Sequence, residues 1–133
     1  MGANMTSGDF NFPESQAPVF NPTRLDLLLE MEEDGDTSTI KEIAAQFLED
    51  ITIQIDSVDS AIRGQDFPKV ASAAHTIKGS AATFGLDRVE KLARQLEESA
   101  KGANHGGESA IHLALCEAFA SGGLALNAYL EAK

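Results

Sequence analysis

The chain has 133 residues, 43% of them hydrophobic, which fits one domain built around one hydrophobic core. Its formal net charge of −11 argues against nucleic acid as a partner, because a phosphate backbone attracts basic proteins. Trp is absent and Tyr occurs once, while Ala, Leu and Ile are abundant, a composition that favours packed helices over a sheet. No uninterrupted apolar run of about 18 residues and no secretory signal is evident, so we expect no membrane span. Cys116 has no second cysteine to pair with, and we expect a buried thiol in the cytoplasm.

The charge is unevenly distributed along the chain. Residues 1–62 contain 13 acidic and 2 basic residues, whereas residues 63–101 contain 5 acidic and 7 basic residues. This basic segment of an acidic protein is a candidate surface for an acidic partner or a phosphoryl group. An ordinary mixed-charge surface would explain these residues equally well, with the exception of Lys78. The candidates are Lys69, Lys78, Arg88, Lys91 and Arg94.

Residues 1–20 mix Gly, Asn, Ser, Pro and acidic residues without periodicity, so we predict a flexible segment followed by one domain over residues 21–133. Asn21 followed by Pro22 is typical of a helix N-terminus, with Asn as the capping residue and Pro at the first helical position. The leucines that follow predict a short helix covering one end of the domain. The acidic cluster over residues 32–36 is predicted to be a solvated loop.

The first long helix is predicted to begin at Thr39, because Thr39 and Glu42 have the spacing of a capping box. Its apolar residues recur every three or four positions and form one stripe of more than six turns. Ile53 falls outside this stripe and is expected to pack against the short helix. Arg63 and Gly64 are expected to end the helix. The stripe consists of Ile40, Ala44, Phe47, Ile51, Ile55, Val58 and Ile62.

The second long helix is predicted over residues 66–84, with Asp66 as its N-cap and Gly85 at its end. Asp87 and Glu90 then begin a third helix in an arrangement like a capping box. Because few residues separate the two helices, they are expected to be antiparallel neighbours. The buried stripes are Val70, Ala74, Ile77, Ala81 and Phe84 in the second helix and Val89, Leu92, Ala93, Leu96 and Ala100 in the third.

A Gly/Asn-rich loop over residues 101–107 leads to a last helix from about Glu108. Because Gly122 keeps the apolar rhythm, we predict one continuous helix whose backbone packs closely at that point. The fold is thus predicted to be all-α, an antiparallel up-down-up-down four-helix bundle with a short extra N-terminal helix. One bundle can bury all of its apolar stripes, so a monomer is expected. The last stripe consists of Ile111, Leu115, Phe119, Gly122, Leu126 and Tyr129.

His75 lies beside the buried stripe of the second long helix. In a helix it shares a face with Ala71 and Ser72 one turn before it, and with Lys78 and Gly79 one turn after it. A glycine in mid-helix costs about 1 kcal/mol relative to Ala, so Gly79 suggests that another molecule approaches the backbone closely. A histidine, a nearby cation and an open surface suit the reversible transfer of a phosphoryl group.

The run from His75 to Ser80 reads His-Thr-Ile-Lys-Gly-Ser and is followed by Gly85-Leu86. With Asp66 upstream and Leu96-Glu97 downstream, this pattern closely resembles the histidine-containing phosphotransfer (HPt) domain of bacterial-type phosphorelays. The resemblance covers roughly residues 20–132, and several spaced positions support it.

This resemblance implies that His75 is the phosphoacceptor, that Lys78 neutralises the phosphoryl oxygens and that Gly79 lets a partner approach. A neutral His75 would attack the aspartyl phosphate of a receiver domain through its outer nitrogen, Nε2, and then pass the group to a second receiver. The implied partners are response-regulator receiver domains and a hybrid histidine kinase. The chain would be a carrier rather than an enzyme, with no cofactor of its own, because the receiver supplies Mg²⁺. The residues predicted to contact a partner are Ala71, Ser72, Ala82, Lys69, Arg88, Lys91 and Arg94.

Other interpretations remain open. The dimerisation helices of a sensor histidine kinase usually place an acidic residue after the histidine and a proline five positions on, where this chain has Thr76 and Ser80. The chain could also be a phosphotransfer domain cut from a larger hybrid kinase, or an interaction bundle that never carries phosphate. His75, His105 and His112 lack the i, i+4 spacing of a helical metal site, so no metal site is predicted.

Overall fold

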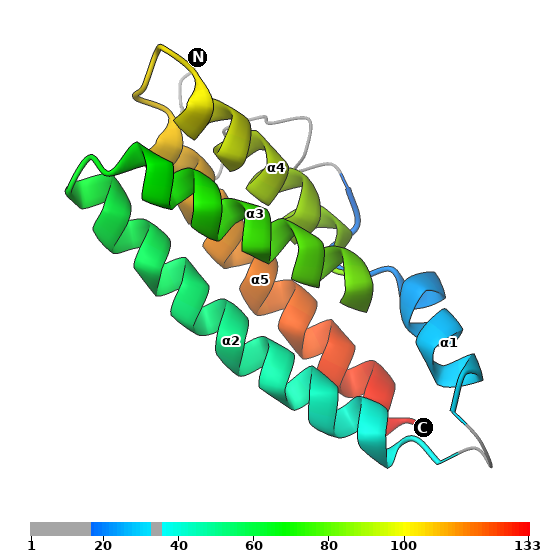
Figure 1. Cartoon of the computed structure of the whole chain (residues 1–133). Coiled ribbons are helices and arrows are strands. Elements are labelled where there is room, and N and C mark those ends of the chain that lie inside the picture. The colour runs from blue at the N-terminus through cyan, green and yellow to red at the C-terminus, as the bar shows by residue number, and fades with distance from the viewer. Residues whose placement is uncertain (1–16, 33–35) are drawn as a thin grey trace.

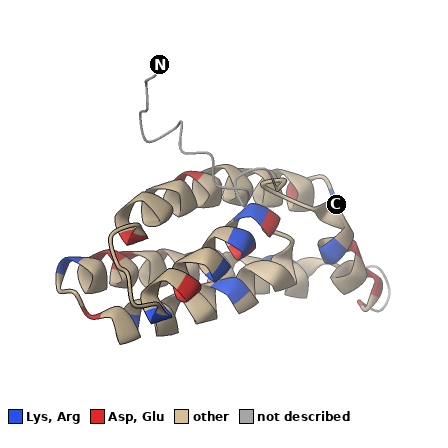
Figure 2. Cartoon of the chain, turned by 90° about the horizontal axis from the view of Figure 1, so that it is seen from above, with Lys and Arg blue, Asp and Glu red and all other residues tan. Residues whose placement is uncertain are grey.

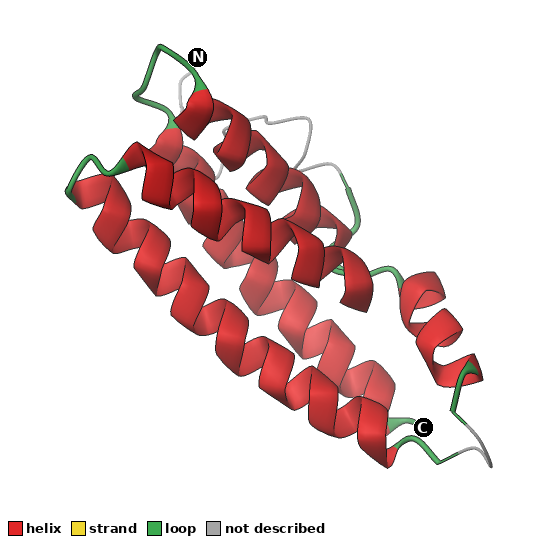
Figure 3. Ribbon diagram, viewed as in Figure 1, coloured by secondary structure: helices red, strands yellow, loops and turns green. Residues whose placement is uncertain are grey.

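The computed structural model describes residues 17–32 and 36–133, and within these ranges the chain is all-helical (Figures 1 and 3). Four long helices run antiparallel in chain order and form the predicted bundle, while the short α1 lies beyond the C-terminal end of α3 (Figure 1). This confirms the predicted fold class. The helices are α1 (Pro22–Glu30), α2 (Ser38–Arg63), α3 (Phe67–Phe84), α4 (Asp87–Lys101) and α5 (Glu108–Glu131).

The apolar stripe of α2 faces the core largely as predicted, because the 3.6-residue period of the helix places these residues on one side. Two details differ. Ala61 is buried at the place predicted for Ile62, and Ile62 packs at the edge of the core. The prediction for Ile53 is wrong, since its side chain is 64% exposed.

The start of α2 also differs from the prediction. The helix begins at Ser38, and Thr39 lies inside its first turn. The carboxylate of Asp36 accepts hydrogen bonds from the backbone N–H of Ser38 at 3.0 Å and from its hydroxyl at 2.8 Å. Asp36 therefore satisfies donors at this helix end, in place of the predicted capping box.

The helix that carries His75, α3, ends as the sequence predicts. Asp66 accepts a hydrogen bond from the backbone N–H of Lys69 at 3.3 Å and caps the N-terminus. Gly85 has φ +78°, a left-handed conformation that suits glycine and closes the helix. α3 and α4 then pack side by side, with all five predicted stripe residues of each helix buried.

The predicted capping box of α4 is wrong. Leu86 is the N-cap residue, and no side chain caps this end. The carboxylate of Asp87 instead accepts a hydrogen bond from the side-chain amide of Asn21 at 3.0 Å. This contact ties the start of α4 to the start of α1.

α5 is one continuous helix through Gly122 and Gly123, as predicted. A Cβ atom on Gly122 would lie 2.8 Å from the carbonyl oxygen of Val19 and 3.0 Å from a methyl group of Leu86. Glycine therefore permits the close approach of the chain segment that precedes α1.

That preceding segment, residues 17–20, makes specific contacts, although the sequence predicts that it is flexible. The carbonyl of Ala17 accepts a hydrogen bond from Nε of Arg88 at 2.7 Å, and that of Pro18 accepts from the Arg88 backbone N–H at 2.9 Å. The backbone N–H of Asn21 donates to the carbonyl of Gly85 at 2.7 Å. The ordered domain thus begins before the predicted boundary at residue 21, and the rest of the predicted flexible segment lies outside the described residues.

By length and composition alone, α5 is apolar enough to cross a membrane. This is a weak signal, because a core helix passes the same test, and α5 packs against α2 and α4.

Cys116 on α5 is half-buried at the edge of the core. Burial and, to a smaller extent, the charges of Asp59 and Asp56 raise the pKa of its thiol.

Candidate functional site

His75 stands in the middle of α3 with its side chain 68% exposed. Two neighbours of His75 in α3, Ala74 and Ile77, face the core and are completely buried. The helical period thus holds the α3 backbone against the core and leaves the imidazole at the surface.

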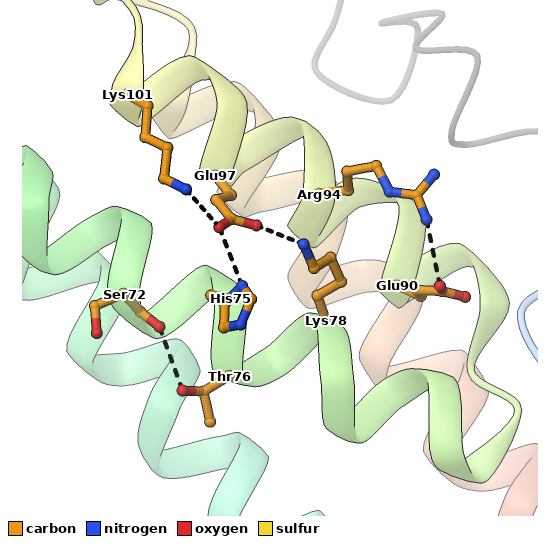
Figure 4. A network of polar contacts seen from close by, with 8 residues as sticks. All are labelled: Ser72, His75, Thr76, Lys78, Glu90, Arg94, Glu97 and Lys101. Carbon is orange, nitrogen blue, oxygen red and sulfur yellow. Dashed lines mark hydrogen bonds and ion pairs between the residues drawn. The ribbon is translucent and has the colours of Figure 1, made fainter.

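The imidazole is held by a residue from the neighbouring helix. Nδ1 of His75 lies 3.1 Å from Oε2 of Glu97 on α4. The same carboxylate accepts hydrogen bonds from Nζ of Lys78 at 2.8 Å and from Nζ of Lys101 at 2.9 Å (Figure 4). One carboxylate therefore joins a histidine and two ammonium groups from two helices.

Glu97 is an unusual residue for its position because it is only 6% exposed. The hydrogen bonds from Lys78 and then from Lys101 outweigh the effect of burial and lower the pKa of its carboxyl group to about 2. At neutral pH the group is a carboxylate, which can only accept hydrogen bonds. Nδ1 of His75 must therefore be the donor in this contact, and in neutral His75 the unprotonated nitrogen is Nε2.

In the sequence, Glu97 belongs to the pattern that resembles the HPt domain, and nothing there predicts a role for Glu97 or Lys101. A local signal existed, because Glu97 lies at the edge of the apolar stripe of α4, between Ala93 and Ala100. A buried acid needs partners, and Lys101 has the i, i+4 spacing that stabilises an ion pair on a helix. The contact with His75 spans 22 residues and depends on how α3 packs against α4.

An open groove of about 730 Å³ lies beside His75, between α3 and α4. Its walls combine small apolar residues with the polar group around Glu97. Another protein could insert a side chain here without displacing the core. The lining residues are Pro68, Ala71, Ser72, His75, Thr76, Glu97, Ala100 and Lys101.

Gly79 lies one turn beyond His75 on the exposed side of α3. A Cβ atom built at this position would meet nothing within 4 Å. The packing of this chain therefore does not require glycine here, in contrast to Gly122.

The other residues predicted to contact a partner are placed differently from one another. Ala71 is buried but lines the groove with the exposed Ser72, and Ala82 is half-buried further along the same face. Among the basic residues, Lys69 is exposed and Lys91 is half-buried.

Two predicted basic residues have contacts within the chain. Arg88 donates to the carbonyl of Ala17, which ties it to the segment before α1. Arg94 lies 3.5 Å from Glu90 and stays 48% exposed. Among the predicted site residues, His75 and Lys78 both contact the same carboxylate, that of Glu97.

The other two histidines lie elsewhere. Nδ1 of His105 is 3.0 Å from the buried Glu108, and Nε2 of His112 is 3.1 Å from the carbonyl oxygen of Ile55. Among residues 17–32 and 36–133, no three His, Cys, Asp or Glu side chains are arranged to hold a metal ion.

Comparison with known proteins agrees with this architecture. A family model described as the Hpt domain matches residues 42–132. Multistep phosphorelay regulator 1 of Schizosaccharomyces pombe is 31% identical over 72 residues, which are 54% of this chain and 24% of that protein. The chain thus spans about a quarter (24%) of the length of that curated relative.

The fold is also similar to a solved structure. The crystal structure of histidine-containing phosphotransfer protein B (HptB) from Pseudomonas aeruginosa superposes with a TM-score of 0.77 at 21% identity, over 89% of this chain and 99% of that one. At this identity the match supports the fold. Because the family model covers well over half of the sequence, this chain belongs to the Hpt domain family, whose members are the phosphocarrier modules of phosphorelays.

Proposed function

We propose that this protein is a phosphorelay intermediate in which His75 receives a phosphoryl group from the aspartate of one receiver domain and passes it to the aspartate of another. The observation that carries the proposal is the 3.1 Å contact between Nδ1 of an exposed His75 and the buried carboxylate of Glu97. It joins a nucleophile, a group that orients it and two cations.

The contact supports Nε2 as the reacting nitrogen. Since Nδ1 donates its proton to Glu97, the lone pair of neutral His75 is on Nε2, on the far side of the ring. Nε2 attacks the phosphorus of the aspartyl phosphate, the new N–P bond forms, and the P–O bond to the receiver breaks with its electron pair leaving on the aspartate carboxylate. The imidazole gains positive charge in this step, which the Glu97 carboxylate stabilises.

The two lysines complete the site. Phosphoryl transfer is promoted by cations that neutralise the transferred oxygens. Lys78 and Lys101 already converge on Glu97 from α3 and α4, at 2.8 and 2.9 Å. We infer that both ammonium groups turn toward the phosphoryl group when it is carried on His75.

Gly79 supports the approach of a partner. A mid-helix glycine costs about 1 kcal/mol relative to alanine, and the packing of this chain gives no reason for it. A receiver domain that brings its aspartate to Nε2 of His75 must pass close to the next turn of α3, where Gly79 leaves room.

The receiver would bring the Mg²⁺ of the reaction, and a hybrid histidine kinase is a further partner. A cytoplasmic location suits the free thiol of Cys116.

The protein could also act as one module of a longer chain, an alternative supported by the curated relative of which it spans 24%. The chemistry at His75 would be the same in that setting, and only the identity of the attached domains would differ.

The test is transfer of label from aspartyl-phosphorylated receiver domains to this protein, with His75→Gln as the matched control. We expect label on the wild type, none on the variant, and a product that survives alkali but not acid, as phosphohistidine does. Label on both proteins would move the site to another residue. No label from any receiver, with the helical structure intact, would favour an interaction bundle that carries no phosphate.

A further inference from the structure

Two carboxylates on α4 are each accompanied by two cations, and they lie seven residues apart on one face of the helix. Glu97 holds Lys78 and Lys101 beside His75, as described above. Glu90, about 10 Å along the helix, has Arg94 at 3.5 Å and Arg24 at 4.0 Å. The second group therefore repeats the first without a histidine, and we call Arg24, Glu90 and Arg94 the arginine cluster.

The carboxylates are withdrawn from the surface while most of the cations are not. The side chain of Glu90 is 13% exposed, whereas Arg94 and Arg24 are 48% and 45% exposed. At the site itself, the side chain of Glu97 is 8% exposed and that of Lys101 is 65% exposed. A molecule that approaches this face meets positive charge, although the whole chain carries a net charge of −11.

The arginine cluster borders the face of His75. Nη1 of Arg24 donates to the carbonyl oxygen of Ala82 at 2.8 Å. Ala82 follows His75 by seven residues, so it lies two turns further along the same face of α3. The cluster is thus continuous with the surface that a receiver must cover to reach Nε2.

The guanidinium groups of the cluster keep N–H donors for an additional carboxylate, although Nη1 of Arg24 donates to Ala82. Their distances to Glu90, 3.5 and 4.0 Å, are longer than the 2.8 and 2.9 Å of the lysine contacts to Glu97. Arginine suits this role because its planar fork binds a carboxylate through two hydrogen bonds.

The opposite flank of α3 has the other charge. α2 carries five acidic and two basic residues, whereas α3 and α4 together carry six basic and four acidic residues. Figure 2 shows the chain with Lys and Arg in blue and Asp and Glu in red. An acidic partner is therefore repelled on the α2 side and attracted on the α4 side.

We propose that the arginine cluster is a docking anchor for carboxylates on the receiver-domain face that surrounds the phosphorylated aspartate. This inference rests on the proposed function. Arg24 and Arg94 bind acidic side chains of the receiver while His75 attacks its phosphoryl group, and they act on association rather than on the chemical step.

The test compares Arg24→Gln with Arg94→Gln in one protein against a matched control, Lys41→Gln with Arg63→Gln. Both variants remove two positive charges, and Arg63 has its own i, i−4 partner in Asp59 at 2.9 Å on α2. Two rates are measured for each protein: transfer from a phosphorylated receiver at several salt concentrations, and labelling of His75 by the small donor phosphoramidate, which needs no docking surface.

We expect the arginine variant to lose about tenfold or more in kcat/KM for transfer from the receiver, with a weaker dependence on salt. Labelling by phosphoramidate should be unchanged, and the control should lose less than about twofold. Equal losses in both variants, or no loss in the arginine variant, would overturn the proposal. If the double variant loses its helical circular dichroism signal, the single variant Arg94→Gln serves as the test. A rate of transfer from the receiver that is unchanged in Arg94→Gln, with the same dependence on salt as in the wild type, would contradict the anchor. If neither donor labels the wild type, the proposed function itself fails and the anchor fails with it.

Discussion

His75 and His105 are held in the same way and yet occupy very different surroundings. Each places Nδ1 beside a buried glutamate, at 3.1 Å from Glu97 and 3.0 Å from Glu108. The pKa of each carboxyl group lies at about 2. In Glu108, burial raises the pKa, but hydrogen bonds from His105, Ser99 and the Gly106 backbone outweigh it.

The surroundings separate the two pairs. The His75 side chain is 68% exposed and shares its glutamate with two lysines. The His105 side chain is 28% exposed, and its ring stacks on Phe67 with 3.6 Å between centroids. The remaining donors to Glu108 come from Ser99 and Gly106, which close the loop between α4 and α5. We therefore propose that a histidine–glutamate pair becomes a phosphotransfer site only where Nε2 is accessible and cations lie nearby, as at His75.

The largest expected effect separates the two histidines directly. His75→Gln should abolish acid-labile labelling by a phosphorylated receiver, because it removes the nucleophile. His105→Gln should retain labelling, since its ring stacks on Phe67 and, among the described residues, the other donors to its Glu108 partner are Ser99 and the Gly106 backbone rather than ammonium groups. Quantifying the label in both variants checks this, and label that depends on His105 would reverse the comparison.

The next effect concerns the cations that distinguish the two pairs. Lys78→Gln should slow transfer by about tenfold, because a half-buried ammonium group is screened little by water. Lys101→Gln should slow it by about threefold, since that side chain is 65% exposed. Single-turnover transfer rates measure both, and a larger loss for Lys101 than for Lys78 would contradict the assignment.

The loop-closing role of Glu108 predicts an effect on stability rather than on transfer. Glu108→Ala should lower the free energy of unfolding by about 2 kcal/mol, because Ser99 and the Gly106 N–H lose their shared acceptor in a buried setting. The exposed Glu98→Ala is the control, with an expected change within about 0.5 kcal/mol. Urea unfolding followed by circular dichroism gives both values.

The same glutamate predicts a pH dependence. The folded-state pKa of Glu108, about 2, is below its ordinary value of 4.5, so ionisation favours the folded state. This contribution is complete above pH 4.5 and is lost as the pH falls from 4.5 toward 2. Glu108→Gln should therefore unfold with a shallower loss of stability over that range than the wild type. An identical acid limb would show that Glu108 has an ordinary pKa.

The last comparison is between two helical glycines, and it includes the smallest expected change in stability, at Gly79. Gly79→Ala should raise the free energy of unfolding by about 0.5–1 kcal/mol, since the new methyl group meets nothing within 4 Å, while transfer slows because the receiver can no longer approach as closely. Gly122→Ala should lower it by about 1–3 kcal/mol, because the methyl group would crowd Val19 and Leu86. Thermal unfolding and transfer rates distinguish them, and a destabilised Gly79→Ala would assign that glycine to packing.

The features that the sequence predicts correctly depend on residues close together in the chain. The stripes that include Val70, Ala74 and Ile77 follow from the helical period alone, and so does the exposure of His75 beside them. The end of α3 at Gly85 follows from the backbone freedom of one residue.

What it could not predict depends on which elements meet. The start of α2 depends on Asp36, whereas a capping box at Thr39 satisfied the local pattern equally well. Asp87 is engaged by Asn21, 66 residues away. The role of Glu97 required knowing that α4 packs against α3 in one register, which no spacing within either helix reveals.

The central claim is that Glu97 holds the Nδ1 proton of His75 and leaves Nε2 to carry the phosphoryl group. The most direct test is a long-range ¹H–¹⁵N correlation NMR spectrum of the phosphorylated protein, which distinguishes the two ring nitrogens of each histidine. We predict that His75 is phosphorylated at Nε2 with a proton on Nδ1, and that His105 and His112 are unmodified. Phosphorylation at Nδ1 of His75, or at another histidine, would contradict the account.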